Sequence, residues 1–340
     1  MEQLSNFTTL RVGGPARKIV HAHSEDELIE FVKTADKENE QILILGGGSN
    51  LLISDEGFAG TVIRVESKGS ALDYDACSGG LIEVSAGEDW DNFVLNTITS
   101  GFADLESLSG IPGTVGGAPI QNIGAYGHEV SETIARVKTY DRLNKEVVTF
   151  TNEQCNFSYR NSIFKQHPGR YVILNVTFQL RKGDLSLPIT YAELAKHLSV
   201  NLGDRVNVLE LRNAVLEIRA SKGMLINLES KINSAGSFFV NPILSKSEAD
   251  KLPLEAPRWP QADGRVKTSA AWLMEKAGVV KGEKLAGAQI SIKHVLALTN
   301  PGDASAEEIV DLARLARKRV FEKFGIKLQP EVQLVGINLD

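Results

Sequence analysis

The amino-acid sequence predicts an α+β fold with more than one domain. The chain has 340 residues, which exceeds the size of a typical single domain. Short apolar strands such as 42–45 and 172–180 stand beside amphipathic helices such as 208–220. This mixture is typical of α+β proteins rather than of one long doubly wound sheet. Two uncharged, glycine-rich stretches interrupt the pattern.

Most predicted elements have a local signal. Ser24 with Glu27, and Ser305 with Glu308, form capping boxes that precede apolar helical stripes. Helices are predicted over 24–39, 90–99, 208–220, 268–277 and from 305 onward. Strands are predicted over 18–22, 42–45, 61–65, 81–85, 134–140, 147–150, 172–180, 294–299 and 331–337. Segment 187–198 is expected to form an extra helix or a lid.

The longer glycine-rich stretch, 109–127, is called the second loop because it comes later in the chain; it reads SGIPGTVGGAPIQNIGAYG and has six glycines, two prolines and no charge. The first loop, 46–50, directly follows the apolar strand 42–45. Glycine lets a ligand approach the main chain closely, and clustered N–H groups bind anions. Two such loops predict a dinucleotide diphosphate site, although both could instead be turns packed under the core. Neither loop has the lysine ending of a P-loop or the G-x-G-x-x-G pattern.

Composition excludes several classes of function. A net charge of -6 gives no basic field for nucleic acid. Cys77 and Cys155 show neither zinc spacing nor a disulfide framework, so we expect two reduced thiols. No signal peptide and no apolar run of about 20 residues is present, which predicts a cytoplasmic protein without membrane insertion. We also expect a monomer. No metal-ligand spacing exists among His21, His23, His128, His167, His197 and His294.

Three polar residues stand in unusual surroundings. Arg160 lies between aromatic and aliphatic residues in FSYRNSIFK, and Ser237 precedes two phenylalanines in AGSFF. Glu331 follows Pro330 at the start of an apolar strand. Each has a structural alternative, because Arg160 could be an ion-pair partner, Ser237 a turn cap and Glu331 an edge-strand charge. Spacing alone does not join the three.

The paired glycine loops resemble the two-loop FAD site of vanillyl-alcohol-oxidase or PCMH-type flavoproteins. Within these, IPGTVGGAPIQNIGAYG is similar to the UDP-N-acetylenolpyruvoylglucosamine reductase (MurB) family. The segments NFTTLRVGGPA, FSYRNSIFK, AGSFFVNP and PEV extend the resemblance from residue 6 to residue 332. It implies NADPH as cosubstrate and FAD bound noncovalently. The implied cofactor-binding residues are Gly46, Gly47, Gly48, Ser49, Asn50, Ile111, Pro112, Gly113, Thr114, Gly116, Gly117, Ala118, Gln121, Asn122, Gly124 and Ala125.

The resemblance also implies a domain order. An FAD-binding PCMH-type domain is expected over 1–183, with subdomains of about 1–66 and 67–183. A lid and connecting helices follow over 184–220, and a smaller α+β substrate-binding domain over 221–325. A C-terminal strand, 326–340, is expected to return to the active site.

The implied reaction reduces UDP-N-acetylglucosamine enolpyruvate to UDP-N-acetylmuramate in peptidoglycan synthesis. Arg160 would stabilise the negative charge that develops on the enolate and its carboxylate. Ser237 would give a proton to the neighbouring carbon. A carboxylate beside a forming anion is unfavourable, so we expect Glu331 to be protonated and to donate a hydrogen bond.

Four further residues are expected to bind the nucleotide sugar. Arg219 and Lys222 are candidates for the diphosphate and Asn241 for a carbonyl or phosphate, while Tyr191 resembles the tyrosine that folds over the uridine nucleotide in the longer subclass. The two cations could instead complement a helix C-terminus, and the tyrosine could be a buried one. The sequence SKGMLI at 221–226 departs from the Leu-Pro-Asp-Pro-like turn of many members.

Two rival functions stay open at this point. One is a flavin oxidase or dehydrogenase of the same fold that acts on another sugar. The other is a regulator that binds a flavin or nucleotide without catalysis.

Overall fold

The chain folds into two compact units in the computed structural model, which describes residues 1–75, 79–226 and 232–340. Unit 1 and unit 2 each have a hydrophobic core of their own. Unit 1 comprises Met1–Glu2, Ala16–Gly48 and Ala59–Leu225. Unit 2 comprises Gln3–Pro15, Ser49–Phe58 and Ile226–Asp340.

These units do not follow the predicted domain boundaries. Residues 184–220 pack within unit 1, whereas 3–15 and 49–58 belong to unit 2. Strand pairing explains why 49–58 belongs to unit 2, because β3 (Leu51–Ile53) lies parallel to β19 (Gln333–Val335) near the end of the chain. The lid and substrate-binding assignments stay predictions.

The first sheet of unit 1 has three strands in the order β1-β4-β2, with β2 parallel to β4. Its strands are β1 (Ala16–Ala22), β2 (Ile42–Leu45) and β4 (Phe58–Val65). Helix α1 (Glu25–Lys37) begins where the Ser24 hydroxyl accepts a hydrogen bond from the Glu27 N–H. The helix is amphipathic, and its buried Leu28 and Val32 join the core with Ile63 of β4.

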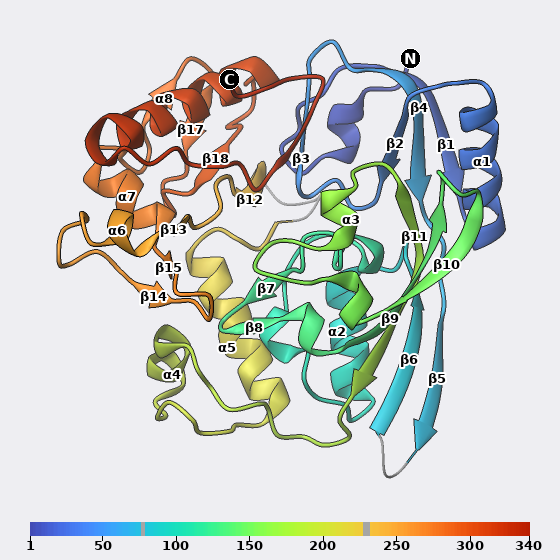
Figure 1. Ribbon diagram of the computed structural model, residues 1–340, viewed down its shortest axis with the longest axis horizontal. Helices are drawn as coiled ribbons and strands as arrows, with labels where there is room; N and C mark the ends of the chain where they lie inside the picture. The colour runs from blue at the N-terminus through green and yellow to red at the C-terminus, as the bar shows by residue number, and fades with distance from the viewer. Residues whose placement is uncertain (76–78, 227–231) are drawn as a thin grey trace. The chain divides into compact units, whose positions relative to one another are not determined.

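The second sheet of unit 1 has five strands in the order β10-β9-β11-β6-β5, all antiparallel (Figure 1). Its central strand is nearly continuous in apolar residues, as expected for a strand that is covered on both faces. Helix α2 (Trp90–Thr99) packs against it, with the Phe93 ring 4.9 Å from that of Phe178. The strands are β5 (Ser70–Asp75), β6 (Gly79–Ser85), β9 (Ile134–Asp141), β10 (Glu146–Thr151) and β11 (Tyr171–Leu180).

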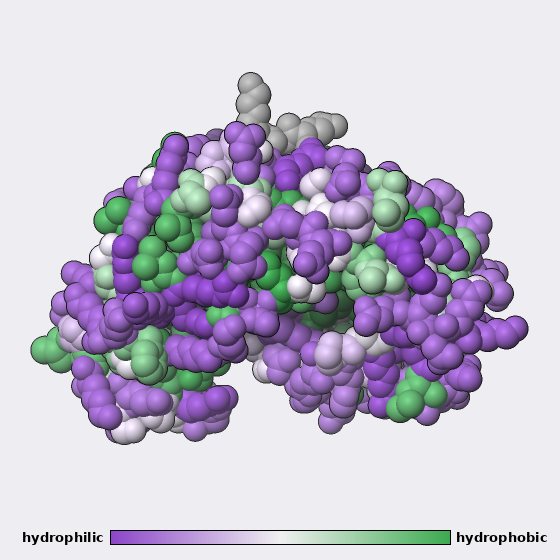
Figure 2. All heavy atoms as spheres, turned by 90° about the horizontal axis from the view of Figure 1, so that it is seen from above, coloured by the Kyte–Doolittle hydropathy of each residue, from purple (hydrophilic) through white to green (hydrophobic). Residues whose placement is uncertain are grey.

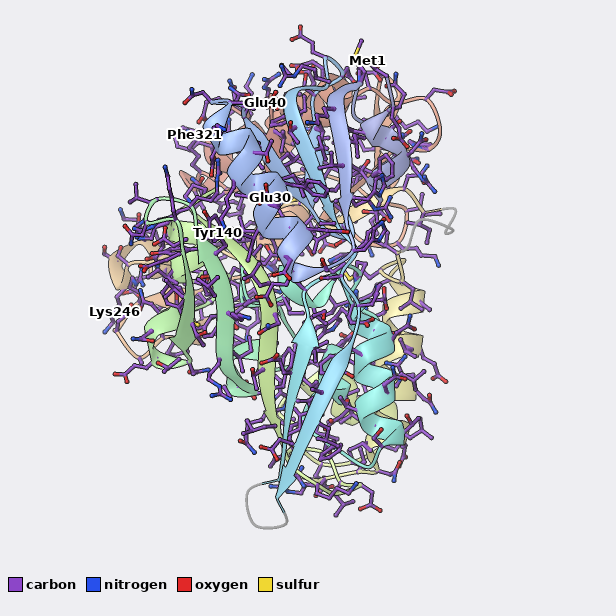
Figure 3. The ribbon with its side chains drawn as sticks, turned by 90° about the vertical axis from the view of Figure 1, so that its right-hand side faces the viewer. Met1, Glu30, Glu40, Tyr140, Lys246 and Phe321 are labelled. Atoms are coloured by element: carbon purple, nitrogen blue, oxygen red, sulfur yellow. The ribbon has the colours of Figure 1, made fainter. Side chains whose placement is uncertain are left out.

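Polar contacts join α1 to β9 and therefore connect the two sheets of unit 1. The Arg142 guanidinium lies 2.5 Å from the Asp36 carboxylate. The Lys33 ammonium lies 5.7 Å from the centre of the Tyr140 ring. Figure 3 labels Glu30 on α1 and Tyr140 on β9, and shows the helix next to this end of the strand.

The remaining part of unit 1 contains α4 (Ala192–Leu198) and α5 (Val208–Ser221), which share a small apolar cluster. The helix predicted over 187–198 begins only at Ala192, because Tyr191 and the residues before it are not helical. The other short elements of this unit are α3 (Ile163–Gln166), β7 (Gly124–Ala125) and β8 (His128–Glu129). Short 3₁₀ helices η1–η5 occupy Leu4–Phe7 in unit 2 and, in unit 1, Glu106–Leu108, Val115–Gly117, Val130–Glu132 and Glu153–Cys155.

Unit 2 is built on a four-stranded sheet in the order β12-β18-β17-β16 (Figure 1). Helix α8 packs against this sheet, and α7 packs against α8. The Asp55 carboxylate accepts a hydrogen bond of 2.9 Å from the N–H of Ala306, at the start of α8. The helices are α6 (Lys246–Ala249), α7 (Ala270–Lys276) and α8 (Ala306–Phe324). The strands, besides β3 and β19, are β12 (Ser234–Ser237), β13 (Ile243–Leu244), β14 (Trp259–Pro260), β15 (Val266–Lys267), β16 (Lys284–Leu285), β17 (Ala288–Ile290) and β18 (Ala297–Thr299).

Hydrophilic side chains cover most of the face shown in Figure 2, and hydrophobic ones form small groups among them. Among the described residues, no helix is long and apolar enough to cross a membrane. The same part of the chain holds no group of three or more His, Cys, Asp or Glu side chains arranged for a metal ion. Cys155 is a buried free thiol, and burial raises the pKa of this thiol to about 12. Cys77 lies outside the described residues.

Replacing Phe178 with Ala should lower the free energy of unfolding by about 3–5 kcal/mol, because the change empties a fully buried site beside α2. Urea denaturation measures the loss. Leu72→Ala on β5 of the same sheet is the control, since Leu72 is 54% exposed and its replacement should change stability by only about 0.5 kcal/mol. Equal losses in the two variants would contradict this account of the core.

Candidate cofactor and substrate site

The two glycine-rich stretches meet in unit 1, where their backbones touch. A Cβ on Gly47 would lie 2.7 Å from the Cα of Gly113, a distance that no real side chain tolerates. A Cβ on Gly46 would lie 2.6 Å from the Thr114 hydroxyl oxygen. Glycine at both positions is therefore required by the close approach of the loops.

The first loop offers hydrogen-bond donors to a ligand. Within the described part of unit 1, the N–H groups of Gly46, Gly47 and Gly48 donate no hydrogen bond. Gly48 has a left-handed φ of 62°, which suits a concave turn of consecutive N–H groups. Three N–H groups that are available as donors lie next to the close approach of Gly47 and Gly113. This arrangement fits the diphosphate of a dinucleotide such as FAD.

The second loop uses part of its backbone for its own packing. The N–H groups of Val115 and Gly116 donate to the carbonyls of Glu88 and Ala86, at 2.9 and 2.8 Å. A Cβ on Gly116 would lie 2.6 Å from that of Ala86. Gly116 is thus needed for packing, whereas Gly117 is exposed, with a neighbour no closer than 3.9 Å to a Cβ built there.

The Arg160 side chain forms hydrogen bonds to the end of the second loop. Its guanidinium donates to the carbonyl of Gly124 at 2.8 Å and to that of Asn122 at 3.4 Å. Arg160 itself has a left-handed φ of 52°. These contacts fix a cation beside the loop, in the unit that carries the glycine contact.

Asn122 connects the Arg160 segment to the second loop. Its buried amide donates to the Glu129 carboxylate at 2.6 Å and to the Ser158 carbonyl at 3.1 Å, and its oxygen accepts from the Ser131 N–H. The Asn122 side chain is therefore engaged within the protein. A role in FAD binding for this residue stays a prediction.

Tyr191 lies just before α4 and packs on the second loop. Its ring stands edge-to-face with that of Tyr126, with 5.5 Å between the centres. Burial raises the pKa of Tyr126 to about 12 and raises that of Tyr191 as well, so both hydroxyls stay protonated at neutral pH. The sequence did not single out Tyr126 as a partner, although its position in the glycine-rich stretch was a usable signal.

Arg219 and Lys222 are both engaged within unit 1. Arg219 is buried and donates to the carbonyls of Gly110 and Met224, at 3.0 and 2.9 Å. Burial lowers its pKa, an effect that Tyr126 opposes. Lys222 forms an ion pair with Glu193 of α4. The predicted contacts of both cations with a diphosphate stay predictions.

Ser237 and Glu331 lie close together along the backbone of unit 2. The Glu331 N–H donates to the carbonyl of Phe238 at 2.7 Å, directly after Ser237. Asn50 at the end of the first glycine loop donates its amide to the Glu331 carbonyl at 3.1 Å. The hydroxyl of Ser237 makes no hydrogen bond to a described residue of this unit, so it is not a turn cap there.

Asn241 has a structural partner in unit 2. Its side-chain oxygen accepts a hydrogen bond of 2.9 Å from the Ala270 N–H, at the first turn of α7. Arg160 belongs to unit 1, whereas Ser237 and Glu331 belong to unit 2. The meeting of these three side chains at one centre stays a prediction.

Comparison with known proteins gives the family. Residues 227–335 match the model of the UDP-N-acetylenolpyruvoylglucosamine reductase C-terminal domain, and residues 16–150 match that of the FAD binding domain. A UDP-N-acetylenolpyruvoylglucosamine reductase of Cutibacterium acnes is 50% identical over 99% of this chain and 90% of its own length. The chain belongs to the UDP-N-acetylenolpyruvoylglucosamine reductase family. A reductase of Streptomyces avermitilis is 46% identical over 99% of this chain and 94% of its own.

The fold agrees with this family. The crystal structure of UDP-N-acetylenolpyruvylglucosamine reductase from Thermus caldophilus matches with a TM-score of 0.68 and 25% identity, covering 98% of this chain and 97% of its own. The predicted reductase family and the α+β fold class with an FAD-binding domain are confirmed.

Replacing Gly47 with Ala should abolish stable FAD binding, because the new Cβ pushes the loops apart at the Gly113 main chain. The flavin absorption of the purified protein measures retention. Gly302→Ala is the matched control, since no atom lies within 4 Å of a Cβ at Gly302. A Gly47→Ala protein that keeps its flavin as well as the control would contradict the loop contact.

His128, next to the second loop, should make stability depend on pH. A hydrogen bond from its ring to Glu132 raises the pKa of His128, while burial opposes this, and the pKa of Glu132 is lowered. A raised folded pKa gives stability that is present below the unfolded value of about 6.5 and lost as pH rises through the folded value.

The stability advantage of the wild type over His128→Gln should therefore fall by about 0.5–1 kcal/mol between about pH 6 and pH 9, a modest figure because Glu132 is 42% exposed. Thermal unfolding at both pH values measures it. Glu132→Gln should lose the same dependence, and a dependence that survives in both variants would point to another group.

Proposed function

We propose that the protein is an FAD-dependent reductase that uses NADPH to convert UDP-N-acetylglucosamine enolpyruvate to UDP-N-acetylmuramate in peptidoglycan synthesis. The touching glycine loops with their three available N–H groups support this, in a chain whose relatives carry that reductase name. Bound FAD supplies the redox chemistry by taking a hydride from NADPH and passing it to the enolpyruvyl double bond. We further propose that the protein works as a monomer in the cytoplasm, which sedimentation and cell fractionation test.

FAD would be held by the backbone of both loops. The proposed donors to its diphosphate are the N–H groups of Gly46, Gly47 and Gly48, because these are not engaged elsewhere in unit 1. The exposed Gly117 allows a flat ligand to approach the second loop without meeting a side chain. The other cofactor-binding residues named from the resemblance complete the proposed lining.

Arg160 is proposed as the cation that stabilises negative charge on the substrate. Its two hydrogen bonds to loop carbonyls hold the guanidinium in place before the reaction begins. Such preorganised charge lowers the barrier more than mobile water does, because it needs no reorganisation when the enolate forms.

Ser237 is proposed as the proton donor, and Glu331 as a group that donates a hydrogen bond to the intermediate. The Ser237 hydroxyl is available because no described residue of unit 2 bonds it, and the backbone on its N-terminal side is open at Gly236, which has no atom within 4 Å of a built Cβ. The hydrogen bond from the Glu331 N–H to the Phe238 carbonyl keeps the backbone at Glu331 beside the backbone that follows Ser237.

The nucleotide would lie against α4 and α5 of unit 1. Tyr191 is 42% exposed, so its ring offers an open face to a uracil base. Lys222 could bind phosphate after release from Glu193, at little cost because such partly exposed ion pairs are weak. In unit 2, Asn241 uses its oxygen at α7, which leaves its amide N–H groups for a substrate carbonyl or phosphate.

Anaerobic half-reactions of Ser237→Ala test the proposal. NADPH should bleach the yellow protein as fast as in the wild type, because that step needs no proton donor to the substrate. Return of the colour with the enolpyruvyl nucleotide should slow by a factor of roughly 10²–10⁴, the usual contribution of a general acid. Ser247→Ala, an exposed serine of the same unit, is the control and should behave as the wild type.

The same experiment separates the rivals. A flavin oxidase of another sugar would not regain its colour from the enolpyruvyl nucleotide without oxygen. A binding protein without catalysis would show no difference between Ser237→Ala and the wild type. Either outcome would overturn the reductase assignment.

A further inference from the structure

The peptide at Gly110 is held from both sides at the entrance of the second glycine loop. Its N–H donates to the Asp91 carboxylate at 2.6 Å, and its carbonyl accepts from the Arg219 guanidinium at 3.0 Å. Gly110 has a left-handed φ of 69° and directly precedes Ile111, the first proposed FAD residue of this loop. Both hydrogen bonds involve a charged partner, which makes them stronger than bonds between neutral groups.

Both charged partners are fixed by helices. Asp91 stands in the first turn of α2, and its two oxygens accept hydrogen bonds of 2.6 and 2.7 Å from Arg212 of α5. Burial alone would raise the pKa of Asp91, but the bonds from Arg212 and Gly110 hold it below its usual value. Arg219 stands two turns further along α5 and has its second bond to Met224. The two helices therefore hold one peptide between them.

The packing leaves no room for a side chain at Gly110. A Cβ at this position would lie 2.8 Å from side-chain carbons of both Leu216 and Leu225, and 3.2 Å from the Arg219 Nε. Arg219 is only 9% exposed. A buried cation is costly unless its hydrogen bonds are made, and these bonds go to the loop and the end of α5.

We propose that Asp91 and Arg219 form a clamp on the Gly110 peptide that sets the second glycine loop for FAD, so that Arg219 is a positioning residue for the cofactor rather than a ligand of the substrate diphosphate. The inference rests on the proposed function in one respect, that FAD is the group bound by this loop. The clamp replaces the contact with the substrate diphosphate that the sequence suggested for Arg219.

Titration of the apoprotein with FAD tests the clamp. Arg219→Met keeps most of the side-chain volume but removes both donors, so the Kd for FAD should rise about tenfold or more, and Arg219→Lys should recover part of the loss. In flavin-saturated protein, the KM for the enolpyruvyl nucleotide should stay within about twofold of the wild type. Arg170→Met, which removes an ion pair with Asp141 elsewhere in unit 1, should leave the Kd for FAD unchanged.

A second variant acts from the loop side. Gly110→Ala should weaken FAD binding because its Cβ collides with the Leu216 and Leu225 side chains at 2.8 Å and lies 3.2 Å from the Arg219 Nε, so the packing around the clamp must shift. Gly203→Ala is the matched control, with a φ of 94° and no atom within 4 Å of its Cβ, so it has the backbone strain without the collision. If Arg219→Met does not fold, this pair decides.

Three results would overturn the clamp. An unchanged Kd for FAD in Arg219→Met with a raised KM for the nucleotide would return Arg219 to the diphosphate. Equal Kd values for Gly110→Ala and Gly203→Ala would show that the peptide does not set the loop. A wild-type apoprotein that takes up no FAD would overturn the proposed function itself, and with it the purpose of the clamp.

Discussion

The close approach of two backbones at Gly47 and Gly113 is the constraint on which the proposed cofactor site depends. Any larger residue at Gly47 would place a carbon 2.7 Å from the opposite main chain. The contact brings together the loop after β2 of the first sheet and the loop after α2, the helix that packs against the second sheet of unit 1. Without that contact the available N–H groups of 46–48 would not lie beside the second loop.

The second loop contains no charge, yet charged side chains from other segments hold its conformation. Asp91 and Arg219 bind its beginning and Arg160 binds its end, while the loop's own Asn122 donates to the Ser158 carbonyl. Buried peptide groups need hydrogen-bond partners, and a loop rich in glycine has few side chains of its own to supply them. The surrounding elements therefore give this loop a rigidity that its own composition does not.

Local patterns in the sequence predicted what depends on neighbouring residues. Strand β2 and helix α2 have the predicted bounds, because an apolar run and an amphipathic stripe mark them. The glycine contact and the family motifs were also readable. Strands β18 and β19 lie within the predicted strands 294–299 and 331–337, but the other two- and three-residue strands of unit 2 were not predicted, since so short a segment carries no period. The Gly110 clamp and the Tyr126–Tyr191 pair depend on residues far apart in the chain, and no local pattern reports such contacts.

The parallel pairing of β3 with β19 means that unit 2 is assembled from both ends of the polypeptide. During synthesis on the ribosome, Leu51 emerges long before its partner Gln333, so this early strand must wait for nearly the whole chain. Unit 1 can complete its own core once residue 225 has emerged, whereas unit 2 cannot. Gene fragments that divide the protein at 225 would likewise leave the later half without a strand, which limits how this enzyme could exchange parts with others.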